Sequence, residues 1–450
     1  MAIKPGLLVL ALLFLAGAAP PGGQESPLQW PAPAPGPPRE AAFPRLLIDP
    51  GELAGRLQAG TAVLLDLRDA GLFEKGHLPG AVVAWSPEEE VPGGVERVRS
   101  LLGERGIACD KAVAIYGGDR ERVARLFWLL CWAGCPEVRI FDGDLATWRA
   151  AGGALKTGPA RRPPTNFRRP ASDTVIVDSR WVAGSFGQEG VELLDVRDAR
   201  GWDQWQTPPI FGSGHIPYSL PFDPGALLPQ GGGWPDAVEL RSRLGRLGPR
   251  AGDPVKLEST FVLYGESPQD PRIGLGYLLL TLAGLETRVF PGGWQEWTAP
   301  GDRPVVRTIS AAELASLLKR ENPGLDQDRR PHGAIVLDLR EPRDFAIGHL
   351  PGALFLPYTP FAEVLGEILQ ARIEREWPDA DRGHPIVLYC YGPECIRSRE
   401  AGLQAARLGF RNILWFRGGV REWRETGYPL LDSAMPTVRR ASPGGGPSRP

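Results

Sequence analysis

Two cysteines near the end of the chain are the residues best suited to chemistry. Their segment reads, in order, Cys390, Tyr391, Gly392, Pro393, Glu394, Cys395, Ile396 and Arg397. A thiolate is a strong nucleophile, whereas a neutral thiol is a weak one. Two thiols this close in sequence are also able to form a reversible disulfide. The segment therefore predicts nucleophilic or redox chemistry at a thiol.

The surroundings of Cys390 favour the charged form of its thiol. The segment lies between an expected strand that ends at Tyr389 and an expected helix. Such a loop can curl so that successive amides point inward and form an anion-binding nest. The unpaired amides and the dipole at the start of the helix act in the same direction. We therefore expect a stabilised thiolate, with Arg397 as the best candidate to reinforce the field and Arg399 as a weaker one.

The other three cysteines carry weaker signals. Cys131 continues an apolar helical pattern, which favours a core position. A disulfide between Cys131 and Cys135 stays open, although an i, i+4 pair on a straight helix has poor geometry for one. Cys109 precedes an expected strand and receives no role. Because the chain has five cysteines, at least one thiol stays unpaired.

The elements around Cys390 occur three times along the chain in the same order. Each copy has an apolar run ending in Asp-x-Arg, then Gly-His-x-Pro, then an apolar run ending in tyrosine, then a helical stretch and a glycine turn before a tryptophan. The marker residues, copy by copy, are Asp66, Arg68, His77 and Tyr116; Asp195, Arg197, His215 and Tyr264; and Asp338, Arg340, His349 and Tyr389. A repeat of this length indicates whole domains and not a solenoid.

Strand-like and helical patterns alternate within each copy. Helical spacing of apolar residues is clear in two places, at Val123, Leu126, Phe127 and Leu130 and at Ala401, Ala405 and Leu408, where Gly409 is a stop. The expected strands are almost continuously apolar, which is typical of strands covered on both faces. The chain is therefore predicted to be an α/β protein with a parallel sheet in each copy.

This ordered set of motifs resembles the rhodanese-like (sulfurtransferase) family along nearly the whole mature chain. The resemblance implies three tandem rhodanese-like domains, each a doubly wound central parallel sheet of about five strands with helices on both faces. It also implies a catalytic cysteine directly after the strand that ends in tyrosine. That position is Cys390 in the third copy but Gly117 and Gly265 in the first two. We interpret the first two domains as inactive, because a glycine cannot hold a sulfur atom.

The third loop departs from the common family pattern. The family usually has an arginine five positions after the cysteine, whereas Cys395 holds that position here and Arg397 lies two residues further on. The loop looks like a subgroup with a second cysteine, and its greater length weakens the expectation of simple thiosulfate specificity. Phosphatases with enlarged loops need an arginine six positions after the cysteine, which disfavours that activity. Cys395 is either a redox partner of Cys390 or a small buried side chain.

The repeated polar residues favour structural roles. His77, His215 and His349 also occur in the copies that lack the thiol, so they are not expected to be catalytic bases. By the same reasoning, the Asp-x-Arg pairs are expected to join strand ends through charge-assisted hydrogen bonds. No closely spaced cluster of metal ligands is present in the sequence, and we expect neither a metal nor another cofactor.

The ends of the chain suggest export. Lys4, the apolar run from Leu7 to Leu15 and the small residues that follow are typical of a cleaved signal peptide. The run is short for a membrane span, which makes a retained anchor less favoured. The predicted parts are a signal peptide (1–18), a Pro-rich disordered lead (19–43), domain 1 (44–156), a linker (157–171), domain 2 (172–306), domain 3 (307–432) and a disordered tail (433–450). The mature protein is expected in the periplasm or outside the cell, without stable membrane insertion.

Composition and motifs together give one leading function and two alternatives. A net charge of −2 without a basic stripe disfavours nucleic-acid binding. The leading hypothesis is an exported sulfurtransferase that moves a sulfane sulfur from a donor such as thiosulfate to a thiol or other nucleophile, through a persulfide on Cys390. The alternatives are a non-enzymatic binding scaffold and a thiol-redox protein that cycles Cys390 and Cys395. Domains 1 and 2 are candidate surfaces for a protein partner.

Overall fold

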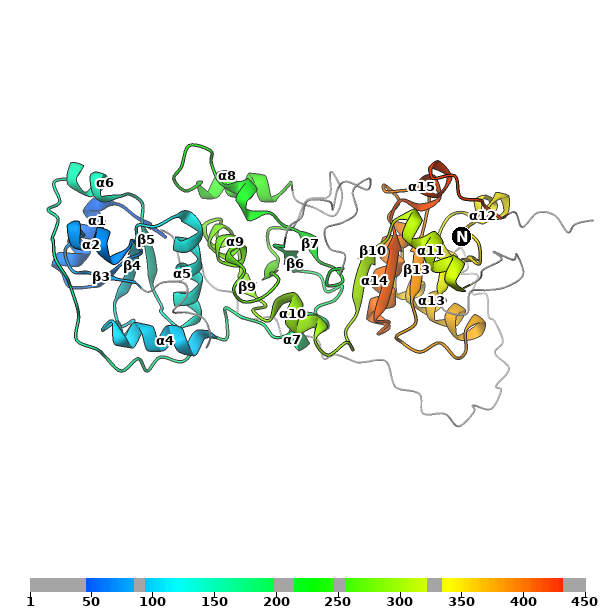
Figure 1. Ribbon diagram of the computed structural model, residues 1–450, viewed down its shortest axis with the longest axis horizontal. Coiled ribbons are helices and arrows are strands. Elements are labelled where there is room, and N and C mark those ends of the chain that lie inside the picture. Colours follow the sequence, from blue (N-terminus) through cyan, green and yellow to red (C-terminus); the bar gives the residue numbers. More distant parts are fainter. Residues whose placement is uncertain (1–45, 85–93, 198–213, 247–255, 322–333, 432–450) are drawn as a thin grey trace, which may run out of the picture.

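The structure of the chain is a computed structural model. It describes residues 46–84, 94–197, 214–246, 256–321 and 334–431. The predicted signal peptide, Pro-rich lead and C-terminal tail lie outside these residues. The described chain contains three parallel sheets, each with its own helices, arranged in a row (Figure 1). Among these residues, no helix combines the length and apolarity needed to cross a membrane.

The first unit has five parallel strands in the order β1-β5-β4-β2-β3. Its elements are β1 (Leu47–Ile48), α1 (Pro50–Gln58), β2 (Ala62–Asp66), α2 (Ala70–Lys75), β3 (Ala81–Val83), α4 (Gly94–Glu104), β4 (Ala112–Tyr116), α5 (Arg120–Trp132), β5 (Val138–Phe141) and α6 (Leu145–Ala150). Both β2 and β4 are buried along their whole length. Successive residues of β4 join different cores, Val113 on one face and Ala114 on the other. Helices therefore cover both faces of the sheet, which explains the continuous apolar runs.

The second unit has four strands in the order β7-β6-β8-β9 among the described residues. Its elements are α7 (Ser179–Gly184), β6 (Val191–Asp195), β7 (Leu220–Pro221), the 3-10 helix η1 (Pro224–Leu227), α8 (Ala237–Leu244), β8 (Thr260–Tyr264), α9 (Pro271–Leu282), β9 (Thr287–Val289) and α10 (Gly293–Thr298). A parallel bridge from Ile176 to Val289 continues the sheet at its edge. The bridge holds the edge position that β1 occupies in the first sheet.

The third unit repeats the five-stranded order, as β10-β14-β13-β11-β12. Its elements are β10 (Val305–Thr308), α11 (Ala311–Glu321), β11 (Ile335–Asp338), α12 (Pro342–Ile347), β12 (Leu354–Phe355), α13 (Ala362–Glu376), β13 (Ile386–Tyr389), α14 (Arg397–Arg407), β14 (Asn412–Phe416) and α15 (Gly419–Glu425). All of its strand pairs are parallel. The predicted fold class, parallel sheets between helical layers, is confirmed.

The repeated motifs form one hydrogen-bond network at the carboxyl ends of the strands. In the third unit, Arg340 Nε donates to Asp338 Oδ1 at 3.0 Å and Arg340 Nη2 donates to Gly348 O at 2.6 Å. Tyr389 Oη donates to Asp338 Oδ2 at 2.6 Å and accepts from Leu350 N at 3.2 Å. The buried charges are thereby paired and hydrogen-bonded, as their burial requires. The network joins three segments that are distant in sequence, which explains why copies without the thiol keep the motifs.

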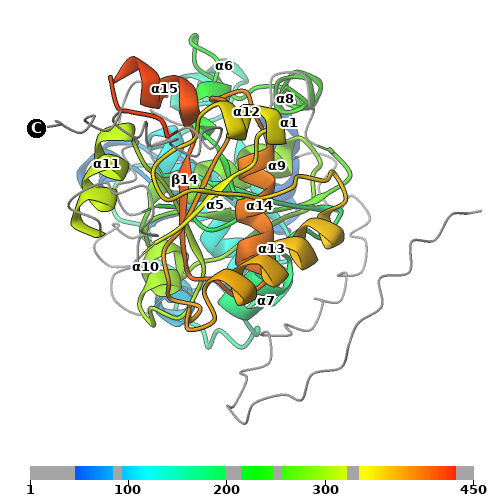
Figure 2. The ribbon, with the colours of Figure 1, turned by 90° about the vertical axis from the view of Figure 1, so that its right-hand side faces the viewer.

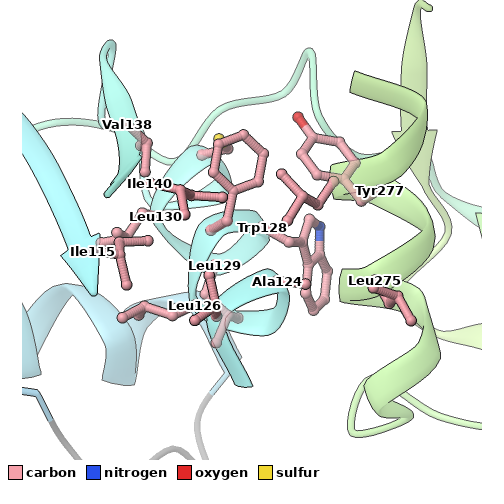
Figure 3. Packing of buried hydrophobic residues seen from close by; sticks show 14 of the residues in the cluster. Ile115, Ala124, Leu126, Trp128, Leu129, Leu130, Val138, Ile140, Leu275 and Tyr277 are labelled. Atoms are coloured by element: carbon pink, nitrogen blue, oxygen red, sulfur yellow. The ribbon is translucent and has the colours of Figure 1, made fainter. Parts of the chain in front are cut away.

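The first two units share one hydrophobic core. Helices α5 and α9 lie side by side, and Trp128 and Ala124 of α5 face Leu275 and Tyr277 of α9 (Figure 3). A Cβ added to Gly274 would lie 2.6 Å from the Arg125 Cα, so only glycine allows the helices to approach this closely. The two sheets are therefore fixed to each other through the helices that follow their central strands.

The second and third units are joined through β10. Val306 of β10 pairs with Ile413 of β14 on one side and with the His215 backbone on the other. The Tyr218 hydroxyl also donates to Leu403 O in α14 at 3.3 Å. Viewed along the long axis, α14 lies in front of α9 (Figure 2). The predicted domain boundary at 306/307 falls within β10, so the second unit passes into the third without an intervening linker.

Candidate active site

Cys390 directly follows β13, at the carboxyl end of the third sheet, and residues 390–396 lead from it into α14. This edge is where open α/β sheets bind their ligands. The start of α15 supports the loop, because Val420 N donates to Cys390 O at 3.0 Å. Gly419 has a φ of +58°, and a Cβ there would lie 2.3 Å from Cys390 O. The glycine turn before Trp423 is therefore needed for the close approach of α15 to the loop.

The structure shows Cys390 in its oxidised state. A disulfide joins Cys390 to Cys395, with their Cα atoms 6.2 Å apart. Cys390 is 1% exposed, and the partly exposed Cys395 is bonded to its sulfur. Cys390 is thus as buried as the core residues of the third unit, although the apolar clusters of that unit include Tyr389 and not Cys390. Nucleophilic chemistry at Cys390 requires reduction of this disulfide first.

Several amides beside the two cysteines remain available. Cys395 N donates to Gly392 O at 3.0 Å, which closes a turn inside the loop. Within the part of the chain that the structure describes, the amides of Tyr391, Gly392 and Glu394 donate to no protein acceptor. Free amides in a strand-to-helix loop are the donors that an anion nest needs. Their convergence on the sulfur stays a prediction.

The corresponding loop of the second unit contains an anion supplied by the chain itself. Asp270 is 7% exposed, and its carboxylate accepts from Glu266 N at 3.3 Å and from Arg272 N at 3.1 Å. A Cβ added to Gly265 would lie 2.7 Å from Asp270 Oδ2. The carboxylate thus lies where a cysteine side chain at position 265 would begin. The carboxylate is also paired with Arg272, whose Nε and Nη2 each donate to it at 2.9 Å, so its charge is neutralised locally.

The loop of the first unit does not hold a carboxylate in this way. Its loop consists of residues 117–119, and the Asp119 side chain caps α5 by accepting from Arg122 N at 2.8 Å. Gly117 has a φ of +74°, and a Cβ there would lie 2.8 Å from Arg68 Cγ. A cysteine at this position would be strained and in contact with the Asp66–Arg68 pair. The first two copies therefore lack the thiol, and their loops leave no space for one.

Arg397 is paired with a carboxylate from another segment. Arg397 Nη1 lies 2.6 Å from Glu341 Oε1 and 3.5 Å from Leu339 O, and its guanidinium lies over the Tyr358 ring. These contacts anchor the start of α14 to the segment that follows β11. That Arg397 reinforces the field on Cys390 stays a prediction, and Glu341 offsets part of its charge.

The remaining loop residues attach the site to its surroundings. The Tyr391 hydroxyl donates to Asp344 and accepts from Glu341 N, which ties the loop to the start of α12. Burial and the hydrogen bond to Asp344 raise the pKa of Tyr391. Pro393 and Ile396 are half-buried, and Glu394 is exposed. Arg399, the weaker candidate cation, lines a small cavity against the second unit, together with Tyr218.

Comparisons with known proteins agree with this architecture. The model of the Rhodanese-like domain family matches residues 49–151 and 310–426, which fall in the first and third units. "Putative thiosulfate sulfurtransferase SseB" of Mycobacterium tuberculosis is 30% identical over 299 residues, covering 58% of this chain and 97% of that protein. The chain belongs to the rhodanese-like family of sulfurtransferases. "Thiosulfate sulfurtransferase" of Azotobacter vinelandii is 25% identical over 274 residues, covering 58% of this chain and 96% of that protein.

Solved structures give more distant likenesses to this rhodanese-like chain. "Crystal structure of YnjE" matches with a TM-score of 0.44 and 20% identity, over 58% of this chain and 68% of that one. A crystal structure of the 3-mercaptopyruvate sulfurtransferase SseA from Escherichia coli matches with a TM-score of 0.44 and 19% identity, over 55% and 98% of the two chains. The second unit lies outside the family-model match. It nevertheless has the parallel sheet and the motif network of a rhodanese-like unit.

The pairing of the remaining cysteines corrects the sequence interpretation. Cys135 forms a disulfide with Cys109 and not with Cys131. Cys109, for which no role was predicted, is buried and has a φ of 54°. Cys131 is buried in α5 and belongs to neither of the two disulfides seen among the described residues, and its burial agrees with the core position that its helical pattern predicts. The pairing was missed because Cys109 and Cys135 become neighbours only when the turns before β4 and β5 come together.

The histidines of this rhodanese-like chain take part in backbone contacts. His77 Nδ1 lies 3.0 Å from Phe73 O, and His349 Nδ1 lies 3.1 Å from Phe345 O. The backbones of His77 and His349 also pair with Lys156 and Leu431, near the end of each unit. These positions agree with a structural role. The described residues contain no group of three or more candidate metal ligands.

Two residues of the site were missed from the sequence. Asp270 was invisible because its carboxylate reaches the Gly265 position only through the curvature of the loop. Arg421 lies beside Gly392, with its Nε 3.4 Å from where a Gly392 Cβ would be. Its position two residues after the Gly-Gly turn was a usable signal, since α15 must pack against the loop.

Proposed function

We propose that this chain is a sulfurtransferase that carries a sulfane sulfur on Cys390. One observation supports this most strongly: Cys390 begins the strand-to-helix loop of the third unit, whereas the other two loops contain no thiol and no space for one. The names of the related thiosulfate and 3-mercaptopyruvate sulfurtransferases support the same reaction class. We also propose export, on the basis of the N-terminal apolar run that follows Lys4.

The reaction proceeds in two displacements at sulfur. The Cys390 thiolate attacks the outer sulfur of a donor such as thiosulfate. The donor's sulfur–sulfur bond breaks, sulfite leaves with the electron pair, and Cys390 keeps a persulfide anion. An acceptor thiolate then attacks the outer persulfide sulfur, and Cys390 leaves as a thiolate. Loop amides are suited to stabilise the negative charge at each stage.

The Cys390–Cys395 disulfide supports a second candidate, a thiol-redox cycle. In it the Cys395 thiolate attacks the inner sulfur of the Cys390 persulfide. The bond to the outer sulfur breaks, that sulfur takes one proton and leaves as hydrosulfide, and the disulfide forms. A dithiol reductant must then reduce the disulfide before the next turnover. A purely structural role as a binding scaffold is the third candidate.

Steady-state assays of three proteins separate these candidates. The reduced wild type, Cys390→Ser and Cys395→Ser are given thiosulfate and an acceptor thiol, and sulfite, sulfide and acceptor persulfide are measured. We expect Cys390→Ser to lose all products and Cys395→Ser to keep sulfite and acceptor persulfide. Sulfide production that requires both cysteines, with no acceptor persulfide, would support the redox cycle instead. A wild type that yields no product would support the scaffold.

A further inference from the structure

The active loop carries an unfavourable charge for an anionic donor. Glu394 lies within it, and its side chain is exposed. Thiosulfate and similar donors are anions, so a nearby cation is needed to offset this carboxylate. Arg397 is already paired with Glu341 at 2.6 Å, which leaves it poorly placed to provide this charge. The cation must therefore come from another element that contacts the loop.

Arg421 of α15 is placed to supply that charge. Its backbone N donates to Tyr391 O at 3.1 Å, which fixes the residue against the loop. Its Nε and Cζ lie 3.4 Å and 3.5 Å from where a Cβ of Gly392 would be. The guanidinium therefore lies within van der Waals distance of position 392, beside the loop backbone. A cation in this position lies beside Gly392, which follows Cys390 by two positions in the sequence.

The side chain of Arg421 is also exposed, and its ion-pair partner can be exchanged for another anion. Arg421 Nη1 lies 3.4 Å from Glu394 Oε2, and the two side chains are 50% and 75% exposed. An ion pair this exposed contributes little stability and opens easily. A donor anion can therefore replace Glu394 as the partner of the guanidinium, at little cost.

The inactive second unit gives an internal comparison. Gln295 N donates to Glu266 O at 3.0 Å, which is the same contact that Arg421 N makes with Tyr391 O. Position 295 thus corresponds to position 421, but its side chain is neutral. The loop with the thiol has an arginine at this position, whereas the second loop has a neutral residue there and pairs its own carboxylate, Asp270, with Arg272.

We propose that Arg421 is the residue that binds the anionic group of the sulfur donor at Cys390, and that Glu394 occupies it when the site is empty. This inference rests on the proposed sulfurtransferase function and specifies its donor class as small anions. Arg421 attracts the donor and orients it, and the Cys390 thiolate then attacks the outer sulfur as described above. Glu394 discriminates against weakly charged donors, because only an anion competes with it for the guanidinium.

Alkylation of the thiol tests this with two probes of similar size and different charge. In the reduced Cys395→Ser chain, the rate at which Cys390 reacts is measured with iodoacetate, an anion, and with iodoacetamide, which is neutral. We expect Arg421→Gln to lower the iodoacetate rate by about tenfold while the iodoacetamide rate changes by less than about twofold. Glu394→Gln is expected to raise the iodoacetate rate, and Arg421→Lys to keep most of it.

Arg424→Gln is the matched control, because it removes the same charge one turn along α15. It is expected to leave the ratio of the two rates unchanged. Equal ratios in Arg421→Gln and the wild type would overturn the proposal, as would an equal loss in Arg424→Gln. Alkylation of Cys390 by either probe does not require sulfur transfer. A changed ratio together with no persulfide formation would therefore reject the proposed function and keep the anion site.

Discussion

At the scale of single residues, the replacement of cysteine by glycine explains only part of the difference between the second and third loops. Asp270 places a carboxylate where a thiol at position 265 would begin, and it occupies the Glu266 amide. A thiol restored alone would crowd this carboxylate, which Arg272 already pairs through two hydrogen bonds of 2.9 Å. The second loop is therefore a self-contained cap for α9.

His215 is a buried histidine whose environment disfavours its protonated form. It is buried where the second unit meets β10, and burial, with Arg399 and Arg197 nearby, lowers its pKa to about 4. Above its ordinary pKa, 6.5, the ring is neutral in the folded and unfolded states. Between about 6.5 and 4 the unfolded chain binds the extra proton, so stability falls as the pH falls.

We therefore expect acid to destabilise the wild type more than His215→Gln, by up to about 3 kcal/mol at pH 4. Thermal unfolding of both proteins at a series of pH values from 7 to 4 measures the difference. His384→Gln, at a partly exposed position of the third unit, is the control and is expected to follow the wild type. Parallel curves for wild type and His215→Gln would contradict this assignment.

At the scale of elements, the contact between α5 and α9 depends on a single glycine. A Cβ at Gly274 would meet backbone atoms of Arg125 at 2.6 Å and 2.8 Å, which no side-chain movement can relieve. Gly274→Ala is expected to lower the free energy of unfolding by about 2 kcal/mol, through overpacking. Gly55→Ala is the matched control, because its helical Cβ would have no neighbour within 4 Å.

Gly55→Ala is expected to be neutral or to stabilise the chain by up to about 1 kcal/mol. Denaturant unfolding of the two variants beside the wild type measures both effects. A Gly274→Ala variant as stable as Gly55→Ala would show that α5 and α9 are free to separate, contrary to the shared core.

Among these elements, those that depend on local sequence were predictable. The strands, α5 and α14 followed from apolar runs and helical spacing, because both depend on neighbours within a few residues. Gly117, Gly265 and Cys390 followed from their place after a repeated tyrosine. The ion pair of Arg397 could not be predicted, because its partner Glu341 lies on another segment. The Cys109–Cys135 disulfide and the anion at Asp270 were missed for the same reason: each depends on how loops distant in sequence fold together.

At the scale of the whole molecule, the chain consists of a fused pair and a third unit attached to it. The first two units share one apolar core, whereas the third has cores of its own. β10 joins the two parts, since Val306 is hydrogen-bonded to the His215 backbone while β10 pairs along its other side with β14 of the third sheet. The first two units therefore hold the edge strand of the third sheet and contact α14 through Tyr218.

The central claim is that sulfur is carried at one position only, in the third unit. The most direct measurement loads the reduced Cys395→Ser chain with thiosulfate, removes the donor and locates added sulfur by mass spectrometry of peptides. The account predicts one sulfur atom on the peptide with Cys390 and none on those with Cys109, Cys131 or Cys135. Added sulfur on any of those three, or none on a reduced and intact Cys390, would contradict it.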